Sequence, residues 1–100
     1  GTLDGFFGLR TIGGSLEVTG NTSMVTLFGV NRVRTINGHL VVFRNRVLRS
    51  ISALNRLQFV GETVNIRENS SLADTLVTAF HDSLMTRGFT GSFSNVDNGP

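Results

Sequence analysis

The stretch Ile36-Asn37-Gly38-His39-Leu40-Val41-Val42-Phe43-Arg44-Asn45 decides the expected fold, because similar stretches occur at one equal offset before it and after it. These flanking copies are 12–21 and 60–69. Four apolar columns agree across the three copies and the residues just before them, at an offset of 24 residues: Leu9, Val33 and Leu57; Ile12, Ile36 and Val60; Leu16, Leu40 and Val64; Val18, Val42 and Ile66. So many matches at one fixed offset indicate an internal repeat.

The repeat predicts short strands and a stack of coils. In each copy two apolar residues alternate with polar or outward residues, as Leu40 and Val42 do, and period two is typical of a strand with one buried face. The Leu-x-x-Ile spacing before it fits a second short strand or a turn. One repeat cannot bury its own apolar edge, whereas stacked repeats share a continuous core. We therefore expect a mainly β chain, a right-handed parallel β-solenoid of three 24-residue coils over residues 1–71.

Two polar columns indicate how the coils turn. Gly13, Asn37 and Gly61 share one column before the main strand, and these residue types tolerate positive φ, so a tight corner is expected there. A second column follows the strand and contains Asn21, Asn45 and Asn69. Stacked asparagines can satisfy backbone groups of a buried bend, which predicts a structural ladder. Two of them begin glycosylation sequons, but an asparagine buried in a ladder could not carry a glycan.

The C-terminal part breaks the repeat and predicts a cap. Apolar residues recur every fourth position, which favours an amphipathic helix over 72–87: Leu72, Leu76, Phe80 and Leu84. Ser71-Leu72-Ala73-Asp74 resembles a capping box, and Arg87 with Gly88 provides a stop. Residues 88–100 are rich in Gly, Ser and Asn, so a flexible tail is expected, with Phe89 and Phe93 available to hold its first half.

The N-terminal edge shows no comparable cap. Leu3 falls in the column of Leu27 and Ile51, so the chain begins partway through a coil. We therefore expect an uncapped edge and a segment of a larger chain or complex.

Arginine supplies all the fixed positive charge of the chain. All nine basic residues are arginine, and six of them lie in 31–60, where there is no acidic residue. Stacking at the repeat period would place Arg10, Arg32, Arg34 and Arg56 along one edge. Such an arginine strip could bind an acidic protein face, or it could be a solvated edge whose aliphatic stems cover apolar surface. Nucleic acid is disfavoured, because the region lacks lysine and has few aromatic residues.

Apolar residues at outward positions are further candidates for partner binding. Val41 and Phe43 fall on the side of the middle strand that should face solvent. They could form a contact surface, as in other repeat proteins, or the chain's own tail could cover them. Phe89 and Phe93 in the tail are also candidate partner contacts.

Catalysis and cofactor binding are disfavoured. The chain has no cysteine, and its two histidines, His39 and His81, show no metal-ligand spacing. No glycine-rich phosphate loop and no catalytic triad can be argued from spacing. Apolar runs of at most four residues, such as 40–43, exclude a membrane-spanning helix.

The motif Ile12-Gly13-Gly14-Ser15-Leu16-Glu17-Val18 with Asn21, repeated at 36–42 with Asn45, resembles the receptor L domain. That leucine-rich module occurs in the insulin and epidermal growth factor receptors, and similar repeats occur in fungal cell-wall proteins. The resemblance covers residues 3–72. The receptor modules usually carry cysteines and this chain has none, so growth-factor binding is not implied.

The resemblance implies a repeat scaffold used for recognition or assembly. Its expected location is extracellular or at the cell surface, with an organelle lumen or a membrane-associated complex as the alternative. Two functions follow from it. One is a non-catalytic protein-binding repeat module, and the other is a structural subunit of a larger assembly, docked through its uncapped edge and the arginine strip.

Overall fold

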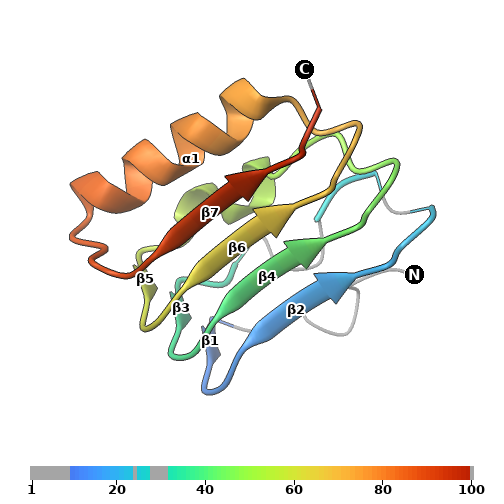
Figure 1. Ribbon diagram of the computed structural model, residues 1–100. Helices are drawn as coiled ribbons and strands as arrows, with labels where there is room; N and C mark the ends of the chain where they lie inside the picture. The colour runs from blue at the N-terminus through green and yellow to red at the C-terminus, as the bar shows by residue number, and fades with distance from the viewer. Residues whose placement is uncertain (1–9, 24, 28–31, 100) are drawn as a thin grey trace.

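The chain forms two parallel sheets and one α-helix (Figure 1). The computed structural model describes residues 10–23, 25–27 and 32–99. The three-stranded sheet has the order β1 (Thr11–Ile12), β3 (Thr35–Ile36), β5 (Phe59–Val60). The four-stranded sheet has the order β2 (Leu16–Thr19), β4 (Leu40–Phe43), β6 (Val64–Arg67), β7 (Phe93–Val96). Helix α1 (Asp74–Thr86) lies beside β7, at the end of this sheet opposite β2.

Residues that lie one repeat apart in the sequence are paired on adjacent strands. Leu16 pairs with Leu40, and Leu40 pairs with Val64. In the other sheet Ile12 pairs with Ile36, which pairs with Val60. A mainly β chain of parallel strands with one C-terminal helix is therefore confirmed.

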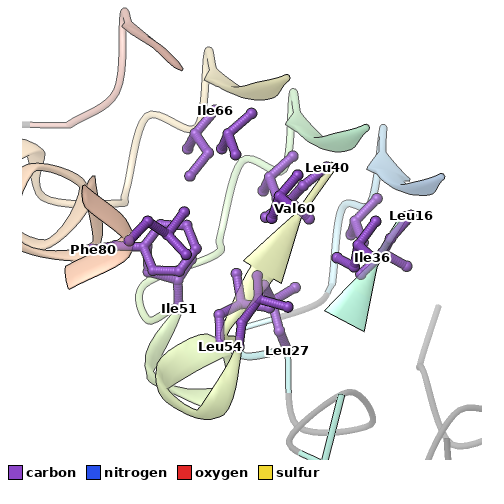
Figure 2. Close-up of a cluster of buried hydrophobic side chains, with 14 of the residues drawn as sticks. Leu16, Leu27, Ile36, Leu40, Ile51, Leu54, Val60, Ile66 and Phe80 are labelled. Atoms are coloured by element: carbon purple, nitrogen blue, oxygen red, sulfur yellow. The ribbon is translucent and has the colours of Figure 1, made fainter. Parts of the chain in front are cut away.

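The alternation within each main strand divides its side chains between the core and the outer face. Leu40 and Val42 of β4 are fully buried, whereas the alternate residues Val41 and Phe43 are only half-buried. The same apolar columns supply the core in β2 and β6. Figure 2 shows side chains from both sheets, from the 3-10 helix η3 (Ser52–Arg56) and from α1 gathered in one cluster. Each fully buried aliphatic side chain stabilises the fold by about 1.5–3 kcal/mol relative to an exposed one.

The corners of the repeat differ from the expectation. Gly13, Asn37 and Gly61 do not adopt positive φ. Positive φ occurs instead at the other end of each strand, in a column directly before each asparagine: Gly20, Arg44, Glu68 and Asp97, at 55° to 65°. The small residue at Gly61 has a packing reason, because a Cβ there would lie 2.1 Å from the carbonyl oxygen of Asn37.

The asparagine column is a continuous hydrogen-bonded ladder. The backbone N–H and the Nδ2 of Asn45 both donate to Asn69 Oδ1, at 3.0 Å each. Asn21 donates to Asn45 Oδ1 in the same way, at 3.2 and 2.9 Å. Asn45 Nδ2 also donates to the carbonyl of Val18 at 2.8 Å, so each amide satisfies backbone groups of the preceding bend. Asn69 is fully buried, which leaves no room for a glycan.

The tail beyond α1 is not the flexible segment expected from its composition. Strand β7 pairs with β6, with Val64 opposite Phe93 and Arg67 opposite Val96. Asn98 then extends the ladder, because its Oδ1 accepts from the backbone N–H and the Nδ2 of Asn69 at 3.2 and 2.9 Å. The insertion of α1 between Asn69 and Asn98 lengthens this last interval, so a search at the repeat period misses the fourth asparagine.

Helix α1 also departs from its expected boundaries and face. It begins at Asp74 rather than at Leu72, and its N-cap residue Ala73 makes no side-chain capping bond, so the capping box does not form. Leu76 is 44% exposed, whereas Phe80 is buried. A strict every-fourth-residue stripe drifts around a helix of about 3.6 residues per turn and so leaves the core. Val77, one residue past Leu76, faces the core in its place.

Two other expectations concern the ends and the membrane. Leu3, on which the expectation of an uncapped N-terminal edge depends, lies outside the described residues. No helix in the described part of the chain combines the length and apolar character that crossing a bilayer requires.

Candidate functional site

The outer face of the four-stranded sheet carries side chains that the rest of the described chain does not cover. We use the name outer sheet face for one patch on it, which consists of Val41, Phe43, Asn65, Arg67 and Val96. Val96 is 42% exposed, and the near side of the sheet in Figure 1 bears no other labelled element. Parallel sheets are usually covered on both faces, so an open face with apolar residues is a candidate contact surface.

Arg67 is the most unusual residue of the outer sheet face. It lies on β6 in register with Phe43 on one side and Val96 on the other. Its Nε is buried and has no hydrogen-bond partner, and the same is true of Asn65 Oδ1, an alternate position of the same strand. A buried polar atom without a partner costs about 1–3 kcal/mol. Strand β6 therefore contains one donor and one acceptor that are buried without partners beneath the outer sheet face.

The nearest charges do not satisfy Arg67. Glu68 accepts a hydrogen bond from Arg44 Nε at 3.3 Å, and both side chains of that ion pair are partly exposed. The Arg44 guanidinium carbon also lies 4.9 Å from the centre of the Phe43 ring, within the range of a cation–π contact. Arg44 therefore pairs with the carboxylate of Glu68 and lies over Phe43 at one edge of the outer sheet face.

Four apolar residues were candidates from the sequence. Val41 and Phe43 lie at the surface, whereas Phe89 and Phe93 pack inward. The tail does not cover Val41 and Phe43, because β7 extends the sheet at the side of β6. Phe89 is only 8% exposed and belongs to the core. The Phe93 ring lies 4.0 Å from the ring of His81 and 6.1 Å from that of Phe80, centre to centre. The interpretation of Phe89 and Phe93 as partner contacts is corrected, since their rings join the tail to α1.

The arginine strip is brought together only in part. Arg34 and Arg10 are neighbours, because the backbone N–H of Arg34 donates to the carbonyl of Arg10 at 2.8 Å. Arg32 lies just before Arg34 in the chain, and Arg56 ends η3. All four side chains are exposed. Of the ion pairs in the described residues, His39–Glu62 and Arg44–Glu68, neither involves Arg10, Arg34 or Arg56.

A hydroxyl, an imidazole and a carboxylate meet where the main strands begin. His39 Nδ1 lies 2.6 Å from Thr63 Oγ1, and His39 Nε2 lies 3.6 Å from Glu62 Oε2. The side chains of His39 and Glu62 are 45% and 59% exposed, so water competes for every contact. The arrangement is a surface hydrogen-bond chain that joins two adjacent repeats.

Two other features bear on ligand binding. A shallow groove of about 240 Å³ lies between η3 and α1 and is lined by Ser50, Ile51, Ser52, Asn55, Leu76, Ala79, Phe80 and Ser83. Within the described residues, no three His, Cys, Asp or Glu side chains gather closely enough to hold a metal ion. The groove shares no residue with the His39 chain or with the outer sheet face.

Comparison with known proteins gives no match: no family model, no curated protein and no solved structure is significantly similar to the chain. Sequence reasoning missed Arg67 and Val96 as members of the outer sheet face. Arg67 lies one repeat after Phe43, and this position could have predicted that the two side chains share the outer sheet face. Val96 could not be found in this way, because the insertion of α1 moves it off the repeat period.

Proposed function

We propose that the chain is a β-solenoid of the receptor L or leucine-rich-repeat type that binds a protein partner through its outer sheet face. The regular parallel register of the strands and the asparagine ladder support the repeat architecture. The proposed role is recognition without catalysis, at the cell surface or outside the cell, with an organelle lumen or a membrane-associated complex as the alternative location.

One observation supports this function above the others. The half-buried guanidinium of Arg67, with an unsatisfied Nε, lies between Phe43 and Val96 on a sheet face that no described element covers. Aromatic residues and arginine are enriched at the centres of protein interfaces, where burial by a partner makes their contacts strong. A partner that covered this face would bury the apolar side chains and could pair with the guanidinium of Arg67.

The test is capture of the partner from cells of the source, with wild type and the Phe43→Ser variant compared. Loss of a partner that wild type retains is the expected result, because the serine removes the half-buried ring from the middle of the face. The matched control is Phe59→Ser, which removes a 52% exposed phenylalanine from the three-stranded sheet. Equal capture by wild type and Phe43→Ser, with circular dichroism unchanged, would reject the outer sheet face as the binding surface.

A second candidate function is a structural subunit docked through the arginine strip. The adjacent, exposed Arg10 and Arg34, which take part in neither ion pair, favour it. Like charges side by side cost little in water, about 1 kcal/mol or less, and an acidic partner would remove that cost. In this case the interface would lie on the three-stranded sheet, so variants at the two surfaces separate the two functions.

A further inference from the structure

We propose that the outer sheet face binds an extended acidic segment of its partner, with a carboxylate on Arg67. This inference rests on the proposed function and names the chemistry of the partner. Arg67 acts as the specificity-determining residue, and Phe43 and Val96 provide the apolar contacts on either side of it.

The guanidinium of Arg67 is complementary to a carboxylate. Arg67 Nε and Asn65 Oδ1 are buried, so the terminal N–H groups of Arg67 are the donors that a partner's carboxylate would meet. The planar guanidinium fork matches a carboxylate in two parallel hydrogen bonds, which adds geometric specificity. Asn65 and Arg67 are alternate residues of β6, so the distance between them suits groups that are close along an extended chain.

The chain itself offers no described carboxylate for this role. Glu68 is held by Arg44, and Glu17 lies on β2, two strands away from β6, which is about 10 Å. Asp97 follows β7 in the column of Glu68, one position beyond the register of Arg67, and takes part in neither ion pair of the described residues. The positive charge on the outer sheet face is therefore available to a partner. Its apolar neighbours exclude water and strengthen the pairing once a partner covers them.

The experiment is a selection from a random peptide library against the full chain, followed by synthesis of the enriched peptides and titration. The expected consensus contains Asp or Glu beside apolar residues. Arg67→Met, which keeps the aliphatic packing, should weaken the selected peptide by roughly tenfold or more. The matched control Arg49→Met removes an exposed arginine elsewhere and should change the affinity less than about twofold.

Charge reversal provides a test that does not depend on loss of binding. Arg67→Glu should reject the acidic peptide and should bind a peptide in which lysine replaces the acidic residue. Recovery of that kind cannot come from misfolding. Failure to recover binding, in a variant whose circular dichroism matches wild type, would overturn the role of Arg67.

The possible results separate this inference from the proposed function. If peptides bind, depend on Phe43, lack acidic residues and bind Arg67→Met unchanged, the carboxylate inference is wrong and the binding face stands. If no enriched peptide depends on Phe43, both are wrong. A peptide with phosphoserine in place of Asp or Glu is the third probe, and tighter binding by about tenfold or more would show that phosphate, not carboxylate, is the group recognised.

Discussion

Asn45 connects three successive repeats through a single buried side chain. Its Oδ1 accepts from Asn21, its Nδ2 donates to Asn69 Oδ1 and to the carbonyl of Val18, and its exposed fraction is 0%. The residue before it, Arg44, has a φ of 58°, so the chain turns sharply at this point and leaves backbone groups that strand pairing cannot satisfy. The side-chain amide of Asn45 forms hydrogen bonds with these backbone groups, which would otherwise be buried without partners.

Replacement of Asn45 by alanine should therefore lower the free energy of unfolding by about 1–3 kcal/mol, because the Val18 carbonyl and the Asn21 amide lose their partner. Urea denaturation measures the change. The control is Asn55→Ala, since the Asn55 side chain is exposed, and its effect should stay below about 0.5 kcal/mol. Equal effects at the two positions would show that the ladder adds nothing to stability.

At the scale of elements, the corners between the two sheets pack backbone against backbone. Gly61 donates its N–H to the carbonyl of Ile36 at 2.8 Å, and a Cβ on it would overlap the neighbouring corner at Asn37. Gly13 occupies the same column of the first repeat, where a Cβ would meet nothing within 4 Å. Position within the stack, and not the column alone, decides what each glycine tolerates.

Gly61→Ala should destabilise the fold by about 1–3 kcal/mol, because the added methyl group forces two adjacent repeats apart. Gly13→Ala should be close to neutral, since its φ is not positive and the space is open. Thermal or urea unfolding of the two variants checks the difference. A large loss for Gly13→Ala would mean that the first corner is packed against another segment.

Strand β7 and α1 lie at the end of the four-stranded sheet opposite β2. Asn95 occupies the register position of Ile66, an inward apolar residue, and its Nδ2 donates to Asp74 Oδ1 at the start of α1 at 2.9 Å. Asn98 Nδ2 donates to Asn95 Oδ1 at 2.8 Å, so the ladder ends on side chains of the cap. At the other end of the helix, Arg87 donates to the carbonyl of Asn55 at 2.9 Å.

The fourth strand should therefore contribute to global stability, which a flexible tail would not do. Phe89→Ala should lower the free energy of unfolding by about 3–5 kcal/mol, because the ring is buried in the core and packs against Phe93 of β7. Thr90→Ala, at an exposed neighbour, should have little effect. Hydrogen exchange gives a second measurement, since the amides of Val64 and Glu68 donate to β7 and the turn before it and should be protected in wild type. Unchanged stability of Phe89→Ala would contradict the packing of the tail.

At the scale of the whole molecule, positive and negative charges are unevenly distributed along the chain. Residues 1–60 contain seven arginines and two acidic residues, whereas residues 61–100 contain two arginines and five acidic residues. The acidic end includes α1 and β7, and the basic end includes the arginine strip. Such a division favours an acidic partner at the arginine strip and does not itself stabilise the fold.

Reversal of two strip charges tests whether the strip binds a partner. Arg34→Glu with Arg56→Glu should change stability by less than about 1 kcal/mol, because both side chains are exposed and belong to neither ion pair. The variant should lose any partner that docks through the strip, and added salt should weaken the same association in wild type. Capture at low and high salt measures both effects, and Arg49→Glu is the control for the change of net charge. Unchanged capture by the double variant would leave the strip as a solvated edge.

The sequence by itself determined the repeat, the strand register and the ladder. Leu40 and Val42 point inward and Val41 and Phe43 outward because side chains alternate along a strand, and that rule needs no knowledge of the rest of the chain. Strand pairing at a fixed offset then places corresponding residues of adjacent repeats side by side. The ladder of three asparagines could therefore be predicted from the sequence. Part of the outer sheet face, Val41 and Phe43, followed from the same local rule.

Only the tertiary structure decided how the stack ends and which polar groups lack partners. The tail has weak strand signals, and β7 forms because the edge of β6 and the apolar face of α1 supply partners distant in sequence. For the same reason Phe89 enters the core and Val96 joins the outer sheet face. Arg67 has an ordinary place in its column. Its importance arises because its Nε is buried without an acceptor on a strand between Phe43 and Val96, a property of packing that no local pattern carries.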